Sequence, residues 1–182
     1  MNLIVAIDEK NGIGLKGNLL YKLPDDLKYF KQMTLGKVVI MGHSTLKALP
    51  GAKPLPGRTN IVLTRNQDID AEGVIVCHTL AALFQTIAPY SSDDVFVIGG
   101  AAVYAQLLEY CHKAYITKVQ CAVPADKFFP DIDNDDNWVL LSESDVKENH
   151  GIRFTYCVYE NNAVVKWPEA SSAPEASLNQ GS

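Results

Sequence analysis

The chain has 182 residues, 47% of them hydrophobic and 20% charged, with a formal net charge of -5. These values are ordinary for one globular domain, and no apolar run approaches the roughly 20 residues that span a bilayer. The acidic balance argues against a nucleic-acid-binding protein, and the start "MNLIVAIDEK" lacks the basic residues of a secretory signal. We therefore expect a cytoplasmic protein, most simply a monomer, that binds neither membranes nor nucleic acids.

The cysteines are widely spaced along the chain and form no metal-binding or redox motif. They are Cys77, Cys111, Cys121 and Cys157, without a C-x-x-C pair or a nearby pair of histidines. Thiols of cytoplasmic proteins are usually reduced. The sequence therefore predicts structural thiols and no metal site.

Short apolar runs rich in β-branched residues alternate with helical patterns. Six runs predict strands, at residues 2–7, 37–41, 60–64, 73–77, 94–99 and 114–119. Helical patterns lie at 24–34, 44–49, 79–88 and 101–111, whereas two later strand-like runs, 138–143 and 153–160, have no helix between them. Because alternating strands and helices build parallel sheets, we expect a single α/β domain with about eight strands and about four flanking helices. The central sheet should be mostly parallel, with an antiparallel edge formed by the C-terminal runs.

Two segments stand outside this alternation. The first, "DEKNGIGLKGNLLYK" at residues 8–22, is too long for a simple turn and is typical of a mobile loop that covers a ligand. After residue 160 the composition shifts to Ala, Ser, Pro, Asn and Gly, which bury little surface. We expect a domain of residues 1–160 and a flexible tail of residues 161–182. Trp167 in this tail is either a docking anchor or an exposed ring.

Two adjacent acids follow a proline at the start of the predicted helix 24–34. A helix N-terminus favours proline and negative charge, which explains acids here in general. At about 100° per residue, Asp26 falls on the apolar side with Leu27 and Phe30, whereas Asp25 falls on the polar side. A carboxylate on an apolar face needs a partner. Asp26 is therefore either a core residue bonded to a backbone group or a Thr hydroxyl, or an acid in a pocket that binds ligand N–H groups or supplies a proton.

Three strand ends carry groups that can donate hydrogen bonds to phosphate. These groups are Gly42, His43, Ser44 and Thr45 in "IMGHSTLKAL", Thr64 and Arg65 in "VLTRN", and Gly99 and Gly100 in "FVIGGAAVYAQ". Each has an ordinary alternative, namely a helix cap, a surface arginine or a tight turn. Together they favour a dinucleotide, because ligands of parallel α/β sheets bind at the carboxyl ends of the strands. The glycines lack the G-x-G-x-x-G spacing, so an ordinary Rossmann domain is not expected.

A set of motifs in one order carries a family resemblance. From about residue 2 to residue 160 the chain resembles bacterial dihydrofolate reductase, through "NGIG", "LPDDLKYFK", "VVIMG", "PLPGRTNIVLT", "VIGGAAVY", "YITKV" and "DKFFPDI". The resemblance implies an oxidoreductase of one-carbon metabolism, and a target of antifolates, that transfers a hydride from NADPH to 7,8-dihydrofolate and forms 5,6,7,8-tetrahydrofolate. It also implies that Asp26 bonds the pterin and supports protonation of its imine, with Tyr21 as the aromatic residue beside the pterin.

For the substrate, the resemblance implies an apolar lining and a cationic clamp. Ile4, Ala6, Leu27 and Phe30 would line the pterin and benzoyl groups, with Leu49 nearby. Thr117 would be the partner of Asp26. Arg58 in "PLPGRTN" would hold the glutamate carboxylate, a task suited to a guanidinium fork.

For NADPH, the resemblance implies that the first long loop closes over the nicotinamide and is held by Asp126. Thr64 and Arg65 would take the 2′-phosphate, and the turn at Gly99-Gly100, with an expected cis peptide, would hold pyrophosphate. The expected cofactor contacts are Ala6, Ile13, Gly14, Asn18, Leu19, Gly42, His43, Ser44, Thr45, Leu63, Thr64, Arg65, His78, Ile98, Gly99, Gly100, Ala101, Ala102, Val103 and Tyr104.

The chain also departs from the family pattern. Leu20-Tyr21 replaces Pro-Trp, His43 and Ala102 stand where arginines face the cofactor in relatives, and Ala125 replaces a glycine. Two anion contacts are thereby missing or weakened. One alternative is therefore a pterin- or nucleotide-binding protein on the same fold with weakened catalysis. Another is a related reductase that acts on a ribosylated pyrimidine during flavin synthesis and has no particular use for the helix acid.

Overall fold

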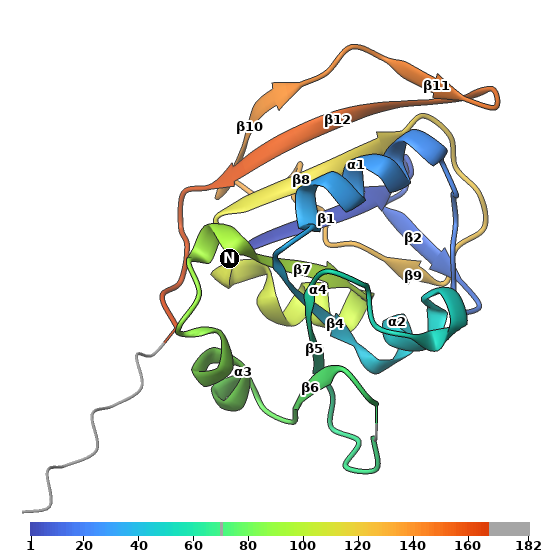
Figure 1. The fold of residues 1–182 in the computed structure, drawn as a ribbon. Coiled ribbons are helices and arrows are strands. Elements are labelled where there is room, and N and C mark those ends of the chain that lie inside the picture. Colours follow the sequence, from blue (N-terminus) through green and yellow to red (C-terminus); the bar gives the residue numbers. More distant parts are fainter. Residues whose placement is uncertain (70, 168–182) are drawn as a thin grey trace, which may run out of the picture.

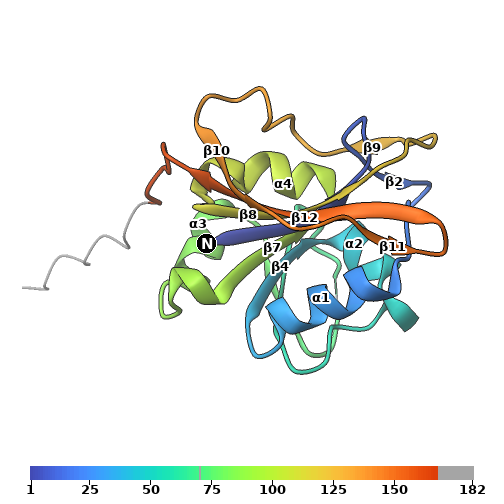
Figure 2. The same cartoon turned by 90° about the horizontal axis from the view of Figure 1, so that it is seen from above.

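A central sheet forms the middle layer of the molecule, with helices on both of its faces (Figures 1 and 2). The structure, a computed structural model, describes residues 1–69 and 71–167. Its strands are β1 (Asn2–Ile7), β2 (Gly12–Leu15), β3 (Asn18–Leu19), β4 (Val38–Gly42), β5 (Thr59–Leu63), β6 (Val74–Cys77), β7 (Val95–Gly99), β8 (Lys113–Val119), β9 (Lys127–Phe128), β10 (Trp138–Glu143), β11 (Lys147–Asn149) and β12 (Ile152–Asn161). Its α-helices are α1 (Pro24–Thr34), α2 (His43–Ala48), α3 (Leu80–Ile87) and α4 (Ala101–Leu107), with short 3-10 turns at η1 (Pro50–Ala52), η2 (Ser92–Asp94) and η3 (Leu108–Tyr110).

The central sheet is mostly parallel and has one antiparallel edge. Its strands follow the order β10-β12-β8-β1-β7-β4-β5-β6, with β11 paired to β12 outside this path. Pairing from β8 to β6 is parallel, whereas β12 runs antiparallel to β8, β10 and β11. The antiparallel strands are those that the sequence joins without a helix, because a short connection reverses the chain direction. The expected α/β fold is confirmed.

The core consists of two apolar layers separated by the sheet. Val38 and Ile40 of β4 belong to the larger cluster, which includes residues of α3 and α4. Val39 and Met41, the residues between them in sequence, belong to a smaller cluster with Leu46 of α2. Successive side chains of a strand point to opposite faces, so a strand covered on both faces is apolar throughout. In Figure 2, α1 and α4 lie on opposite faces of the sheet.

Part of the expected covering loop is regular structure. Within residues 8–22, β2 and β3 form a hairpin, and β2 also pairs with β9 in a separate three-stranded sheet. Gly14 is opposite both Leu19 and Lys127. The sequence pattern missed these strands because β3 and β9 have two residues each and two of the four residues of β2 are glycine, which leaves no apolar alternation to detect. The loop therefore has a defined hydrogen-bonded partner in the segment that contains β9.

The helix expected over residues 101–111 is shorter in the structure. α4 ends at Leu107, and the next turn, η3, is a 3-10 turn. Cys111 follows as a buried residue, and its thiol donates to the Leu107 carbonyl at 3.3 Å. The sequence pattern predicted this helix but not the tightening of its last turn.

Residues 161–167, which we expected to open the tail, lie against the domain. Asn161 is the last residue of β12 and is buried. The Val165 N–H donates to the Glu109 carbonyl at 2.8 Å, and the Trp167 ring stacks on Phe84 with ring centroids 5.7 Å apart. Of the two interpretations of Trp167, docking is the one found. The rest of the expected tail, residues 168–182, lies outside the described residues.

None of the helices in the described part of the chain is long and apolar enough to cross a membrane. The four cysteines are unpaired thiols, and three of them are buried.

Candidate active site

Asp26 and Thr117 meet between α1 and the central sheet. The Thr117 hydroxyl on β8 donates to Asp26 Oδ1 at 2.6 Å. Thr117 is opposite Ala6 of β1 in the parallel pairing, so this hydrogen bond lies at the carboxyl ends of two adjacent strands. Thr117 is buried and Asp26 is half-buried, whereas Asp25 is exposed. The helix periodicity thus predicted the inward-facing acid, and its partner is a Thr hydroxyl.

The environment of Asp26 changes its acidity. Burial raises the pKa of the Asp26 carboxyl above its ordinary value, and the hydrogen bond from Thr117 opposes part of this rise. Desolvation penalises the charged form, so the carboxyl keeps its proton to a higher pH than an exposed aspartate. Such a group can donate a hydrogen bond or a proton nearer to neutral pH.

The residues expected to line the substrate come from β1, α1 and the end of α2. Ile4 is buried, Ala6, Phe30 and Leu49 are half-buried, and 47% of the Leu27 surface is exposed. Apolar side chains of α1 and β1 thus flank the Asp26–Thr117 pair. Their contact with a substrate stays a prediction.

Arg58 is held beside the C-terminal end of α1. Its Nε and Nη2 groups both donate to the Thr34 hydroxyl oxygen at 3.2 Å, and Nη1 donates to the Pro56 carbonyl at 2.8 Å. The Thr34 hydroxyl in turn donates to the Phe30 carbonyl at 2.8 Å. Arg58 forms no ion pair within residues 1–69 and 71–167. Its guanidinium is therefore oriented by neutral acceptors and retains N–H groups for an anion.

The strand ends that carry hydrogen-bond donors lie side by side at the carboxyl ends of the parallel strands. β4 lies between β5 and β7, and Gly42 is opposite Leu63, while Met41 is opposite Gly99. The Gly99-Gly100 peptide is cis. A Cβ at Gly100 would lie 3.3 Å from the Thr45 hydroxyl oxygen, and one at Gly42 would lie 3.2 Å from a Val103 methyl. The N-termini of α2 and α4 therefore approach each other closely, with little room for side chains between them.

The other expected cofactor residues continue along these strand ends. His43, Ser44 and Thr45 form the first turn of α2, and Ala101, Ala102, Val103 and Tyr104 form that of α4. The Tyr104 hydroxyl donates to the Ile4 carbonyl at 2.7 Å, which ties α4 to β1. Beside β5, His78 Nδ1 lies 3.0 Å from the Thr64 carbonyl oxygen, and Arg65 is exposed. Ile98 of β7 packs against the smaller core cluster.

The residues expected from the covering loop lie on the small sheet. Ile13 and Gly14 are in β2, and Asn18 and Leu19 form β3. Asp126 accepts from the Lys16 N–H at 3.0 Å, and its own N–H donates to the Gly14 carbonyl at 3.0 Å. The loop and the segment before β9 are thus connected in both directions.

Comparison with known proteins identifies the family. The family model described as "Dihydrofolate reductase" matches residues 1–161. The chain belongs to the dihydrofolate reductase family. Dihydrofolate reductase of Aedes albopictus is 36% identical over 178 residues, covering 87% of this chain and 96% of the relative. That of Bacillus subtilis (strain 168) is 35% identical over 162 residues, covering 88% and 94%.

A solved dihydrofolate reductase structure has the same fold. The enzyme from Enterococcus faecalis, complexed with NADP(H) and RAB-propyl, has a TM-score of 0.80 and 34% identity, covering 88% of this chain and 95% of that one. The sequence-based assignment to the dihydrofolate reductase family, and with it to an oxidoreductase, is confirmed. Insect and bacterial relatives match at similar identity, so these values support the whole family and not its bacterial members alone.

Tyr21 lies in a side cluster of this dihydrofolate reductase family member. It packs with Leu23, Val119 and Phe154, and its hydroxyl oxygen accepts from the Cys121 thiol at 3.2 Å. Burial raises the pKa of the Tyr21 phenol, and the Cys121 contact adds to this effect. The phenol is therefore neutral at physiological pH and provides an aromatic face with one polar atom.

Several residues around the site were not singled out from the sequence. Asp8, Thr34 and Asn149 each bond a group that belongs to the candidate site or to the loop beside it. Thr34 and Asn149 are ordinary polar residues of a helix and a hairpin, and their partners are distant in sequence or on another element. The sequence could have indicated Asp8, because an acid directly after a buried apolar strand is itself near the core and needs hydrogen-bond partners.

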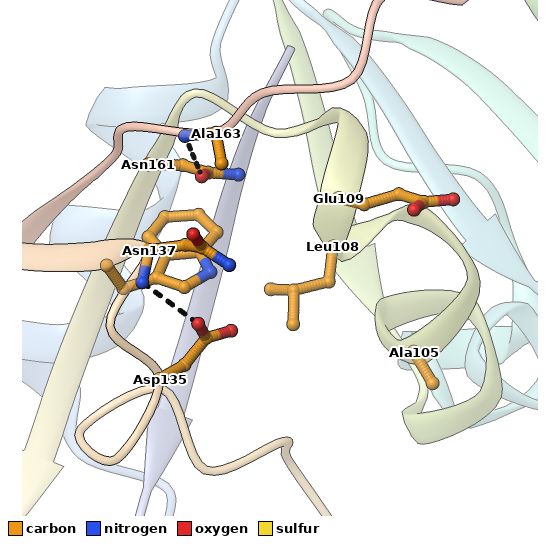
Figure 3. Close-up of a pocket in the computed structure, with 8 residues that line it drawn as sticks. Ala105, Leu108, Glu109, Asp135, Asn137, Asn161 and Ala163 are labelled. Atoms are coloured by element: carbon orange, nitrogen blue, oxygen red, sulfur yellow. Dashed lines mark hydrogen bonds between the residues drawn. The ribbon is translucent and has the colours of Figure 1, made fainter.

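A hollow of about 300 Å³ lies away from the site, between η3 and the loop before β10 (Figure 3). It is lined by Ala105, Leu108, Glu109, Asp135, Asn137, Trp138, Asn161 and Ala163. Its polar groups are used internally, since Asp135 accepts from the Asn137 N–H and Asn161 from the Ala163 N–H. Across residues 1–69 and 71–167, no cluster of His, Cys, Asp or Glu has the arrangement of a metal site.

Proposed function

We propose that the chain reduces 7,8-dihydrofolate to 5,6,7,8-tetrahydrofolate with NADPH. One observation carries this proposal: the half-buried Asp26 carboxyl, bonded to Thr117, lies at the strand edge where the Gly99-Gly100 turn joins β7 to α4. Ligands of open α/β sheets bind outside the carboxyl ends of the strands. Family membership and the named relatives favour this reaction over others that the same edge could support.

Asp26 is the residue assigned to the acid chemistry. A carboxyl group with a raised pKa can accept two hydrogen bonds from the amino group and ring N–H of a pterin, and can supply a proton through water to the imine nitrogen being reduced. The Thr117 hydroxyl occupies one acceptor position of Oδ1, which leaves lone pairs on both carboxylate oxygens for such a ligand. Tyr21 contributes an aromatic wall and no proton, because burial raises the pKa of its phenol and the phenol therefore keeps its proton at physiological pH.

The residues at the other strand ends fit NADPH. A Cβ at Gly42 or Gly100 would crowd the approach between α2 and α4, whereas glycine leaves main-chain groups accessible to a pyrophosphate. Ser44 and Thr45 add hydroxyl donors, and Thr64 with the exposed Arg65 suits a 2′-phosphate. When bound, NADPH supplies the hydride, and the chain's residues orient the reactants and exclude water.

Arg58 is the proposed clamp for the substrate's glutamate carboxylate. Thr34 and Pro56 orient its guanidinium, so less rotamer entropy is lost when a carboxylate binds. The same fork would favour a planar carboxylate over a phosphate held at a single point.

The first test is the loss of NADPH absorbance after dihydrofolate is added to the purified chain, with NADH in parallel. We expect rapid loss that requires dihydrofolate and prefers NADPH. Asp26→Asn should lower turnover by about 100-fold or more, the range typical of general acid–base groups. Asp25→Asn is the matched control, because its carboxyl is exposed one residue away. Equal turnover in both variants would contradict the role of Asp26.

The alternative, a binding protein with weakened catalysis, is favoured by Tyr21, His43 and Ala102 alone. It predicts that the folded protein binds dihydrofolate and NADPH but leaves the absorbance unchanged. The retained Asp26, Thr117 and Arg58 contacts argue against it, because each is oriented by a specific hydrogen bond.

A further inference from the structure

Asp8 is a buried acid that the proposed chemistry does not use. It follows the last residue of β1, only two residues after Ala6, and 3% of its surface is exposed. A buried carboxylate is costly unless hydrogen bonds compensate for the lost water. The hydrogen bonds that surround Asp8 therefore indicate what it holds.

The Asp8 carboxylate bonds two separate segments. Oδ1 accepts from the N–H groups of Lys10 at 2.9 Å and Gly12 at 2.8 Å, within the start of the loop that contains β2 and β3. Oδ2 accepts from the Val123 N–H at 3.3 Å, in the segment before β9. Main-chain bonds reinforce both connections, from Asp8 N–H to the Gly12 carbonyl and from Glu9 N–H to the Cys121 carbonyl, each at 3.1 Å.

Apolar packing contributes little to this junction. The two segments border a hollow of about 380 Å³, lined by Lys10, Ala122, Val123, Pro124, Ala125 and Phe128. Val123 is 40% exposed and Phe128 is 49% exposed. Because the apolar side chains here are partly exposed, the Asp8 carboxylate provides the side-chain hydrogen bonds between the loop base and the segment before β9, beside the main-chain bond from Glu9 to Cys121.

Asp126 holds the same loop at a different point. It accepts from the Lys16 N–H at 3.0 Å in an exposed position, whereas the Asp8 carboxylate is buried, its bond from Gly12 is buried and its bonds from Lys10 and Val123 are partly buried. Exposed hydrogen bonds exchange with water and open easily, whereas buried ones are expensive to leave unmade. Besides its main-chain bonds to β9 and the neighbouring residues, the loop is therefore held by one buried carboxylate near its base and one exposed carboxylate near its tip.

We propose that Asp8 is a positioning residue that fixes the base of this loop against the candidate active site, so that only the outer part of the loop moves when ligands bind. This inference rests on the proposed function. It assigns Asp8 no contact with the reacting atoms. Its effect passes through the loop, which leaves β1 beside the strand end where Ala6 is opposite Thr117.

Two substitutions of Asp8 separate its hydrogen bonds. Asp8→Asn keeps one oxygen for Lys10 and Gly12 but turns an NH2 group toward the Val123 N–H, so the side-chain bond between the two segments is lost while their main-chain bonds remain. Asp8→Ala removes every acceptor. Asp133→Asn is the matched control, since Asp133 also accepts hydrogen bonds, from Lys118 of β8 and Tyr159 of β12, but bonds no residue of the loop.

The first readout does not require activity. Amide hydrogen exchange of the free protein should be faster by about tenfold or more in peptides covering 8–16 and 121–128 of Asp8→Asn, because opening these segments no longer breaks the bond between the Asp8 carboxylate and the Val123 N–H. Peptides covering 152–161 should be unchanged. Asp133→Asn should leave both loop segments as in the wild type. Unchanged exchange in Asp8→Asn would overturn the proposal whether or not the chain is a reductase.

The second readout is the split between kcat and KM. Below the melting temperature of each variant, Asp8→Asn should lower kcat roughly tenfold or more, because misplacing a closing segment disturbs orientation. KM for dihydrofolate should change less than about twofold, since Arg58 and Asp26 are untouched. Equal kcat in Asp8→Asn and Asp133→Asn would overturn the proposal, while an inactive wild type would refute the proposed function instead.

A third variant covers the case in which both Asp8 variants fail to fold. In Gly12→Ala the carboxylate is retained, but the new methyl would lie 3.0 Å from both Asp8 oxygens and from the Ala125 Cβ. It should speed exchange in the same two segments. Slow, wild-type exchange in this variant would count against the junction.

Discussion

Asn149 of β11 bonds Asp25 of α1 twice, across 124 residues of sequence. Its Oδ1 accepts from the Asp25 main-chain N–H at 3.0 Å, and its Nδ2 donates to the Asp25 carboxylate at 2.9 Å. Leu23, at the N-cap position, provides no side-chain cap. The hairpin of β11 and β12 therefore caps the helix that carries Asp26. A tilted ring contact between Tyr29 of α1 and Tyr156 of β12, with centroids 4.3 Å apart, joins the same two elements.

Loss of this distant cap should destabilise the domain. Asn149→Ala is expected to lower the free energy of unfolding by about 1 kcal/mol, as removal of an N-cap side chain usually does. Urea denaturation checks this value. Asn134→Ala is the control, because Asn134 bonds only Asp131 in an exposed loop, and it should cost less than about 0.5 kcal/mol. Equal losses of unfolding free energy in the two variants would show that Asn149 does not stabilise α1 as a cap.

The half-buried acid Asp26 should lower the stability of the folded protein near neutral pH. Burial raises the pKa of Asp26 in the folded state. The folded protein is therefore most stable, as far as this group is concerned, below the unfolded-state pKa of about 3.9, where Asp26 is protonated. This stability is lost as the pH rises through the folded-state pKa. Asp26→Asn cannot ionise and still accepts from Thr117. It should melt at a higher temperature than the wild type near neutral pH, with the difference shrinking toward pH about 4. Melting curves of both proteins across this pH range test the prediction. A difference in melting temperature that does not change with pH would contradict a raised pKa of Asp26.

Asp133 should show the opposite dependence. Partial burial alone would raise its pKa, but the hydrogen bonds from Lys118 and Tyr159 hold the pKa of this carboxyl below its ordinary value. Its contribution to stability is present above the unfolded pKa of about 3.9 and is lost as pH falls through the folded pKa. Asp133→Asn should therefore melt lower than the wild type near neutral pH, with the two converging in acid. A gap that widens on acidification would refute this assignment.

Thr34 should act on substrate binding through Arg58. In Thr34→Val the guanidinium loses the acceptor of two N–H groups, so KM for dihydrofolate should rise about tenfold, with kcat nearly unchanged. Thr86→Val is the matched control, because the Thr86 hydroxyl also donates to the carbonyl four residues earlier in its helix, but it touches no arginine. Steady-state kinetics of the two variants test the difference. Similar KM values in both would mean that Thr34 does not orient Arg58.

Helix and strand periodicity accounted for much of the fold. The 3.6-residue repeat of α1 placed Asp26 on the apolar side and Asp25 on the polar side, because successive residues of a helix point in different directions. The alternation of strands and helices predicted the parallel sheet and the antiparallel edge. The small sheet of β2, β3 and β9 escaped this reasoning, since strands of two to four residues with glycine carry no periodic signal.

Some residues of the candidate site could be named from the sequence, whereas the contacts that orient them appeared only in the structure. Motif order was enough to name Thr117, Arg58 and Gly99-Gly100, because these positions belong to a family pattern. It did not reveal that Thr34 orients Arg58, that Asp8 joins the loop to residue 123, or that Asn149 caps α1. Each of these contacts is a hydrogen bond between a common polar side chain and a distant main-chain or side-chain group.

By itself the sequence determined the element types, the inward-facing acid and the family, because local periodicity and ordered motifs depend on neighbours along the chain. The tertiary structure alone decided the strand order, the docking of Trp167 and the partners of the buried polar groups. The physical reason is that a buried donor or acceptor must be satisfied, but any nearby polar group can satisfy it. Only the packed fold selects which one is near.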